Sequence, residues 1–216
     1  RPVRFGLRGL KGLGQGAAEA LLAARRRVGR FASFAQLVEE IDPKSVNSKV
    51  FETLIKSGAC DALGPHRAAL SAAMESMMAW GQRRRQEIEA GQGSLFGGGA
   101  GEAHVSGAPA IDPRTPPWTE DVRLRAEKEA LGFFLTGNPL LAYQGQIARL
   151  TTHTTRSARE GFSGTATVGG LVTRVKRVKI KSGANAGKVM ARFVLEDQHG
   201  GLAATLHASA LRAESG

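Results

Sequence analysis

The fold of this chain follows from one short stretch, which reads Leu10-Lys11-Gly12-Leu13-Gly14-Gln15-Gly16-Ala17-Ala18. Two leucines alternate with two glycines, and a run rich in Ala, Leu and Arg continues from Ala17 to Arg27. Because glycine has no Cβ, its backbone adopts positive φ angles and lets another molecule approach closely. Since Ala, Leu and Arg are strong helix formers, the stretch predicts a tight turn that opens into a helix.

This turn resembles a helix-hairpin-helix element. In such an element the N–H groups at the start of the second helix point at a phosphate, and the helix dipole favours the anion. Such contacts position a duplex without reading its sequence. An ordinary glycine-rich turn between packed helices is the alternative. The residues expected to bind DNA here are Arg8, Lys11, Gly12, Leu13, Gly14, Gln15 and Gly16.

Further helix signals follow in the first 90 residues. Ser33 with Gln36 forms a capping box, and Asn47 caps a helix that ends at Ser57-Gly58. Pro65 at a first helical position predicts a long helix that runs to about Glu89. Residues 55–64 resemble a weaker second hairpin, although a plain helix C-cap explains that segment better.

Charge and composition narrow the class of protein. The chain has 216 residues, a formal net charge of +11 and one cysteine, Cys60, which excludes an intramolecular disulfide framework. Residues 1–90 carry 15 basic and 9 acidic residues, residues 91–160 carry 7 of each, and residues 161–216 carry 8 and 3. Two basic modules therefore flank a neutral middle, which makes nucleic acid the expected partner. No apolar run suits a membrane span or a signal peptide, so we expect a cytoplasmic protein without membrane contact.

The middle of the chain is expected to be a flexible linker, because Gly97–Gly101 and four prolines lie within it. At its start stands Gln92-Gly93-Ser94-Leu95-Phe96. Adjacent Leu and Phe exposed to water are unfavourable unless they anchor in a partner's apolar pocket. This pattern resembles the Gln-x-x-Leu-Phe peptide that binds the sliding clamp, with Gln92, Ser94, Leu95 and Phe96 as contacts. Alternatively, the two apolar residues fold back onto the helices.

The last third changes from helical to alternating periodicity. Thr119 caps a predicted helix at 120–131, and strands are predicted at 189–196 and 202–206 with a hairpin loop at 182–187. Simple alternation puts Arg174 and Lys176 on one face of a further strand. It puts Arg177, Lys179 and Lys181 on the other, with Lys188 nearby. This hairpin resembles the opening strands of an OB-fold, which binds single-stranded nucleic acid. A solvated basic edge that discourages strand aggregation is the alternative.

Taken together, the motifs resemble the bacterial C-family replicative DNA polymerases, the DNA polymerase III alpha-subunit family. The resemblance rests on Arg4–Leu7 and Lys11–Gly14, Phe51–Ala59, Gln92–Phe96, Glu127–Phe133, Asn138–Leu140 and Gly170–Val172. It implies an α+β, multidomain segment. Its expected parts are a tandem helix-hairpin-helix domain (1–90), a linker with a clamp-binding peptide (91–117), a helical connector (118–160) and a truncated OB-fold (161–216).

That resemblance also implies a function. The segment would hold primer–template duplex and single-stranded template, bind the sliding clamp and work beside other holoenzyme subunits of a DNA-directed DNA polymerase. The catalytic aspartates and their Mg²⁺ are expected in an upstream palm domain, so we predict no catalytic residue, metal site or cofactor here. An error-prone paralogue, a stand-alone DNA-binding or clamp-adaptor protein and an RNA-binding protein are the alternatives. The first residue, Arg1, favours a piece of a longer protein over an adaptor.

Overall fold

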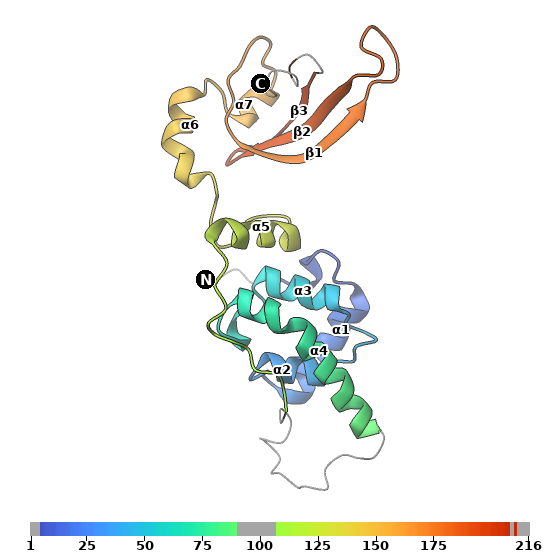
Figure 1. Ribbon diagram of the computed structural model, residues 1–216. Helices are drawn as coiled ribbons and strands as arrows, with labels where there is room; N and C mark the ends of the chain where they lie inside the picture. Colours follow the sequence, from blue (N-terminus) through green and yellow to red (C-terminus); the bar gives the residue numbers. More distant parts are fainter. Residues whose placement is uncertain (1–4, 90–106, 208–209, 211–216) are drawn as a thin grey trace. The chain divides into compact units, whose positions relative to one another are not determined.

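The computed structural model describes residues 5–89, 107–207 and 210. The chain divides into two compact units, residues 1–138 and residues 139–216 (Figure 1). The boundary falls inside the segment expected to connect the modules. The helix expected at 120–131 therefore belongs to the first unit, and each unit is described by itself.

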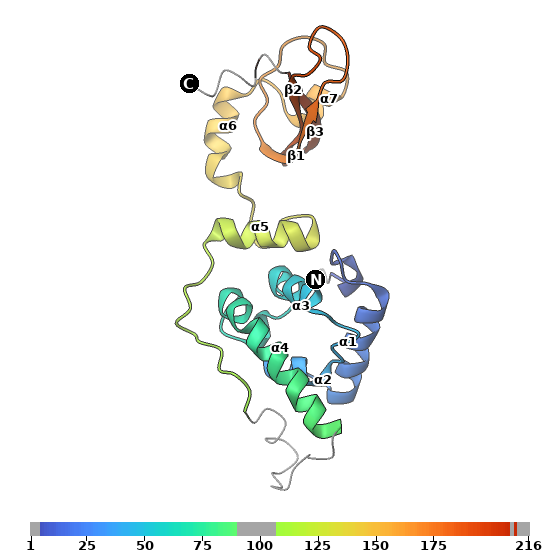
Figure 2. The same cartoon turned by 45° about the vertical axis from the view of Figure 1, so that its right-hand side comes forward.

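The first unit is helical. Its elements are η1 (Leu7–Gly9), α1 (Gln15–Val28), α2 (Phe34–Glu40), α3 (Ser48–Ser57), η2 (Asp61–Leu63), α4 (Arg67–Glu89) and α5 (Glu120–Leu131). Helix α4 packs against both α2 and α3, and α5 lies along α3, as Figure 2 also shows. One apolar core joins these helices, with Phe34, Ile55 and Leu70 at its most buried positions. The expected helical first module is therefore confirmed.

Short-range cap signals placed most helix ends correctly. The Ser33 side chain accepts a hydrogen bond from the Gln36 N–H, and Asn47 caps α3 by accepting from the Val50 N–H. Helix α3 ends at Gly58 in the left-handed conformation, so the C-cap interpretation of that segment is confirmed. The predicted start of α4 at Pro65 is wrong, because the helix begins at Arg67.

His66 explains that difference. Its Nδ1 accepts a hydrogen bond from the Ala69 N–H at 3.2 Å, and its carbonyl accepts from the Leu70 N–H. The imidazole thus occupies the N-cap position that Ser, Thr, Asp or Asn usually fills. Pro65 lies just before the cap, where it limits the entering backbone but is not part of the helix.

Helices α2 and α4 approach closely at one glycine. A Cβ built on Gly81 would lie 2.7 Å from the Val38 Cγ1. Contacts that short do not occur between packed carbon atoms, so the two helices meet there because position 81 lacks a side chain. Val38 is buried, and this contact therefore fixes how deeply α4 sits on α2.

The second unit is a small α+β assembly. Its elements are η4 (Leu141–Tyr143), α6 (Gln144–Leu150), α7 (Thr155–Arg159), β1 (Leu171–Lys179), β2 (Val189–Asp197) and β3 (Gly200–Leu206). The three strands form an antiparallel sheet in the order β1-β2-β3, and α7 packs against β3 and β2. The α+β class is confirmed. Among the described residues of this unit, Ala191 is the one buried apolar side chain.

The register of β1 corrects one expectation. Thr173 pairs with Val194 and Lys176 with Arg192, so three steps on β1 match two on β2. Arg174 lies at this bulge with a φ of 53°, a backbone angle that side chains other than glycine adopt rarely. Simple alternation is therefore interrupted at the bulge and does not by itself place Arg174 relative to Lys176. Lys176 instead follows Thr173 on one face.

A half-buried carboxylate ties the sheet to α7. Asp197 accepts hydrogen bonds from the Thr155 N–H at 2.8 Å and the Thr155 hydroxyl at 2.6 Å. It also accepts from the N–H groups of His199 and Gly200 in the turn between β2 and β3. Burial by itself raises the pKa of Asp197, but these hydrogen bonds outweigh it, and the pKa lies below its usual value.

Candidate nucleic-acid interface

The hairpin before α1 leaves a helix N-terminus open. Leu10 and Leu13 are buried and fix the loop to the core, while Gly12 between them has a φ of 77°. Gly14 is the N-cap of α1 and supplies no side chain to it. The N–H groups of the first helical turn have no partner within the helix, so they are available to an anion.

No described part of the chain packs against Gly14 or Gly16 at this helix end. A Cβ built on Gly14 or Gly16 would meet no atom within 4 Å, and both residues are exposed together with Gln15. Packing inside the protein therefore does not require glycine at these two positions. The bare backbone at these positions leaves room for another molecule to approach closely.

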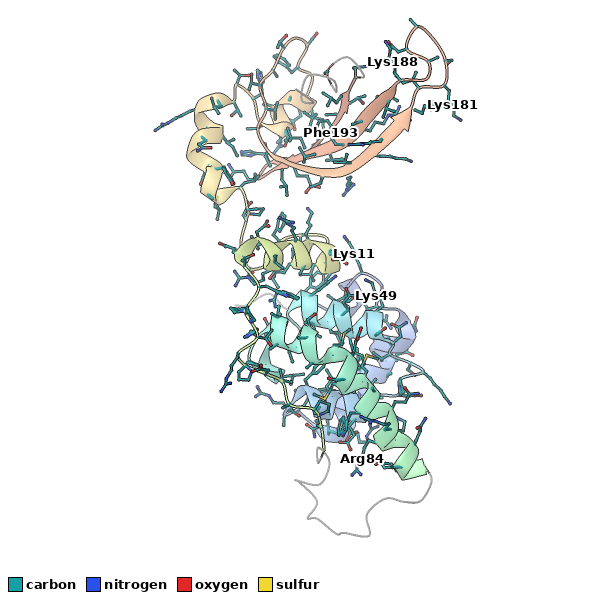
Figure 3. The ribbon with its side chains drawn as sticks, in the orientation of Figure 1. Lys11, Lys49, Arg84, Lys181, Lys188 and Phe193 are labelled. Atoms are coloured by element: carbon teal, nitrogen blue, oxygen red, sulfur yellow. The ribbon has the colours of Figure 1, made fainter. Side chains whose placement is uncertain are left out.

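Lys11 has contacts that the sequence did not reveal. Its backbone N–H donates to the Ala130 carbonyl at 2.8 Å, and its Nζ donates to the Lys128 carbonyl at 3.3 Å. Figure 3 shows Lys11 beside α5. A lysine ammonium at the carbonyl end of a helix is favourable because it meets the negative end of the dipole. Lys11 therefore joins the hairpin to α5.

Arg8 and Gln15 complete the predicted hairpin set. The Arg8 side chain is 71% exposed, and its Nη2 lies 3.9 Å from a carboxylate oxygen of Glu19. Gln15 donates a hydrogen bond to the same carboxylate at 2.8 Å. Such an exposed ion pair is weak, so the Arg8 guanidinium can exchange Glu19 for a phosphate at little cost.

Ion pairs hold α5 against α3 and α4. The Lys56 Nζ lies 2.7 Å from Glu129 on α5 and 2.6 Å from Glu52 on its own helix. Glu127 is fully buried, and its carboxylate lies 2.9 Å from the Arg67 Nη1. Arg67 also makes a bidentate pair with Asp61, at 2.8 and 2.9 Å. The helix α5 is therefore an integral part of the unit that carries the hairpin.

The basic residues predicted in the second unit are exposed. Arg174, Lys176, Arg177 and Lys179 lie on β1, whereas Lys181 lies in the loop after it. Lys188 is in the same loop, as Figure 3 shows, and its Nζ donates to the Asn185 side chain. Phe193 on β2 is half-buried, so the sheet offers little aromatic surface beside these charges.

The remaining predicted site lies outside the described residues. Gln92, Ser94, Leu95 and Phe96 fall within residues 90–106, which follow α4 in the sequence. In the described parts of the chain, no group of His, Cys, Asp and Glu side chains could hold a metal ion. Within those same parts, no helix has the length and apolar character that crossing a membrane requires.

The sequence did not predict that α5 packs beside the hairpin and is held there by a buried ion pair. Glu127 and Arg67 are 60 residues apart, and only burial of both side chains shows that they pair. The available signal was Glu127 itself, a charge at a helix position flanked by the buried Leu124, Ala130 and Leu131. A charge on an apolar face is expected to have a partner elsewhere in the fold.

The open glycine turn at the start of α1 is the geometry of the helix-hairpin-helix class, and the family described as "Helix-hairpin-helix motif" matches residues 1–70. Over nearly its whole length the chain is also similar to one segment of the DNA polymerase III alpha subunit. It is 33% identical to that of Vibrio cholerae over 214 residues, which are 97% of this chain and 18% of that protein.

Two further relatives carry the same name. The chain is 34% identical to the alpha subunit of Thermus aquaticus over 204 residues, 93% of the chain and 16% of the relative. It is 32% identical to the alpha subunit of Escherichia coli K12 over 216 residues, which are 97% of this chain and 18% of that relative. The chain thus spans less than a fifth of these proteins. The resemblance to replicative polymerases that its motifs predicted is confirmed.

Proposed function

We propose that this chain is the DNA-holding region of a bacterial replicative DNA polymerase. The observation that carries the proposal is the N-terminus of α1, which has no side-chain cap and where no described atom would contact a side chain at the exposed Gly14 or Gly16. The similarity to DNA polymerase III alpha subunits supports primer–template duplex as the ligand. Nucleotide transfer and its Mg²⁺ then belong to parts of the polymerase outside this chain.

The hairpin can be tested by a substitution that separates folding from binding. Gly14 has a φ of −68° and open space around it, so Gly14→Asp fits the fold. Aspartate is a preferred N-cap, and its carboxylate occupies the N–H groups that a phosphate would take. We expect unchanged or higher thermal stability and at least a tenfold loss of affinity for a fluorescent primer–template duplex. The matched control is Gly145→Asp, which adds the same charge on α6, where a Cβ also meets no atom within 4 Å.

Salt dependence provides the second readout. Affinity should fall steeply with salt, and Gly14→Asp should reduce the slope of log K against log salt by about one, the value for one lost phosphate contact. Wild-type affinity that does not change between low and moderate salt would contradict the phosphate contact. Equal duplex affinity of the wild type and Gly14→Asp would mean that the DNA contact does not lie at the hairpin.

We further propose that Gln92, Ser94, Leu95 and Phe96 tether the polymerase to its sliding clamp. The sequence pattern and its position between α4 and α5 support this proposal. Changing both Leu95 and Phe96 to alanine should abolish retention on the clamp while leaving duplex affinity intact. Retention that survives the double substitution would contradict the tether.

For the second unit, we propose that the basic residues of β1 and its following loop bind single-stranded template as part of an OB-fold. Their exposure supports the proposal, and charge is the main contribution because Phe193 is half-buried. Changing Lys176 and Lys179 together to glutamine should weaken binding of a single-stranded oligonucleotide and lower its salt slope. Unchanged binding would favour the solvated edge instead.

A further inference from the structure

Two aromatic rings from distant parts of the sequence meet beside the hairpin. The rings of Phe5 and Phe133 form an edge-to-face pair with centroids 5.3 Å apart and an interplanar angle of 72°. Phe5 is 49% exposed and Phe133 is 39% exposed. Exposed aromatic pairs of this kind leave apolar surface in water, so their presence calls for an explanation outside the core.

This aromatic pair is part of the hairpin surface. A Cβ built on Gly9 would lie 2.4 Å from the Phe5 Cζ, so the ring covers the backbone one residue after Arg8. On the other side, a Cβ built on Gly132 would lie 3.2 Å from the Lys11 Cε. The residue before Phe133 therefore touches the stem of Lys11. The two rings therefore lie near the hairpin backbone next to Arg8 and near the stem of Lys11, and these four side chains are called the patch.

The composition of the patch defines its ligand. Arg8 and Lys11 are exposed cations, and the two rings near them are apolar. A DNA strand has the complementary composition, because charged phosphates alternate with apolar deoxyribose faces. A protein partner of the same surface would need carboxylates spaced around an apolar residue, which no observation on this chain favours.

We propose that the aromatic pair of Phe5 and Phe133 binds DNA by packing against the deoxyriboses that flank the phosphate held by the hairpin. This inference rests on the proposed DNA-holding function and adds an apolar contact to it. The contact brings together the segment before the hairpin and the segment after α5. Both parts of the first unit, separated by more than a hundred residues of sequence, then grip the same strand.

The test is a salt series on the full chain with both phenylalanines changed to alanine. We expect duplex affinity to fall about fivefold to tenfold at every salt concentration, the effect of removing roughly 40–50 Å² of apolar contact. The slope of log K against log salt should not change, since no charge is removed. The matched control is Val122→Ala, which truncates a 42%-exposed side chain in the first turn of α5, far along the helix from Phe133.

Each outcome has a distinct meaning. Wild-type affinity in the double variant overturns the aromatic contact but leaves the proposed function standing, whereas wild-type chain that binds no duplex overturns the proposed function itself. A changed salt slope also overturns the contact. If the double variant does not fold, Phe133→Trp replaces it. Emission of the new indole, taken as the difference from wild type, should change when duplex is added, and no change overturns the contact.

Discussion

Changing Glu127 to glutamine tests whether α5 belongs to the first unit. The carboxylate is fully buried and accepts hydrogen bonds from the Arg67 guanidinium, the Leu135 N–H, and both the N–H and hydroxyl of Thr136. Glutamine has the same shape but one acceptor oxygen fewer and no charge. Its amide NH₂ must face at least one of these donors, which leaves buried groups unsatisfied.

The magnitude follows from what remains of the network. Removing one partner of a buried ion pair typically costs about 3–5 kcal/mol when the other charge is left alone. Arg67 retains its bidentate pair with Asp61, so we expect Glu127→Gln to lower the free energy of unfolding by about 2–4 kcal/mol. The control is Glu129→Gln. That side chain is 57% exposed, and losing its pair with Lys56 should cost at most about 1 kcal/mol.

The measurement is urea unfolding followed by helical circular dichroism, repeated as the pH is lowered. Burial alone raises the pKa of Glu127, but the hydrogen bonds from Thr136, Arg67 and Leu135 outweigh it and hold the pKa below the ordinary 4.5. A carboxyl with a lowered folded-state pKa stabilises the protein above its unfolded-state value and loses that contribution as the pH falls through the folded-state value. The difference in the free energy of unfolding between the wild type and Glu127→Gln should therefore become smaller below about pH 4.5.

Two results would refute this reasoning. A loss below about 1 kcal/mol at neutral pH would mean that the network contributes no more than a surface pair. A difference between the two proteins that stays constant from neutral to strongly acidic pH would mean that the lost stability does not come from the carboxylate charge.

Three other predictions concern different parts of the fold. Gly81→Ala should lower the free energy of unfolding by about 1–3 kcal/mol because the new methyl group clashes with Val38, and adding Val38→Ala should restore part of the loss. An unchanged free energy of unfolding in the single variant would contradict the close approach of the two helices. Asp197→Asn should increase hydrogen exchange at Thr155 and in the turn after β2, with a cost of about 1–3 kcal/mol, and unchanged exchange would show that the carboxylate is dispensable. Burial and the nearby Asp61 charge raise the pKa of the Cys60 thiol to about 12, so a thiol reagent at mildly alkaline pH should label Cys60 in urea but not in the folded chain; rapid labelling of the folded chain would contradict its burial.

Local signals in the sequence predicted the helices well, because a cap involves residues three positions apart. Ser33, Asn47 and Thr119 each accept the hydrogen bond that their position predicts. Where the chemistry departed from common preferences, the prediction failed. His66 caps α4 through a ring nitrogen, and a preference for proline at the first helical position therefore placed the start of α4 two residues too early.

The strand register shows a different limit. Alternation assigns faces correctly along β2, where every residue from Ala191 to Asp197 pairs in order with β3. It fails on β1 because one extra residue is inserted at Arg174. Nothing in the local sequence marks this bulge. Glycine or asparagine would be the usual residue at a φ of 53°, and the chain has arginine there.

Lys11 shows why residue type alone cannot assign a contact in a basic chain. From sequence, a lysine inside a glycine hairpin is a phosphate ligand; in the fold, its ammonium also meets the carbonyl end of α5. Under the proposed function both roles use the same positive charge, since a cation that neutralises the end of a helix lowers the electrostatic cost of bringing DNA near that end. A substitution at Lys11 would therefore disturb the contact with α5 as well as the proposed binding, so its effect on DNA affinity alone could not be assigned. Gly14, whose surroundings are empty, is for that reason the position at which binding can be altered while folding is preserved.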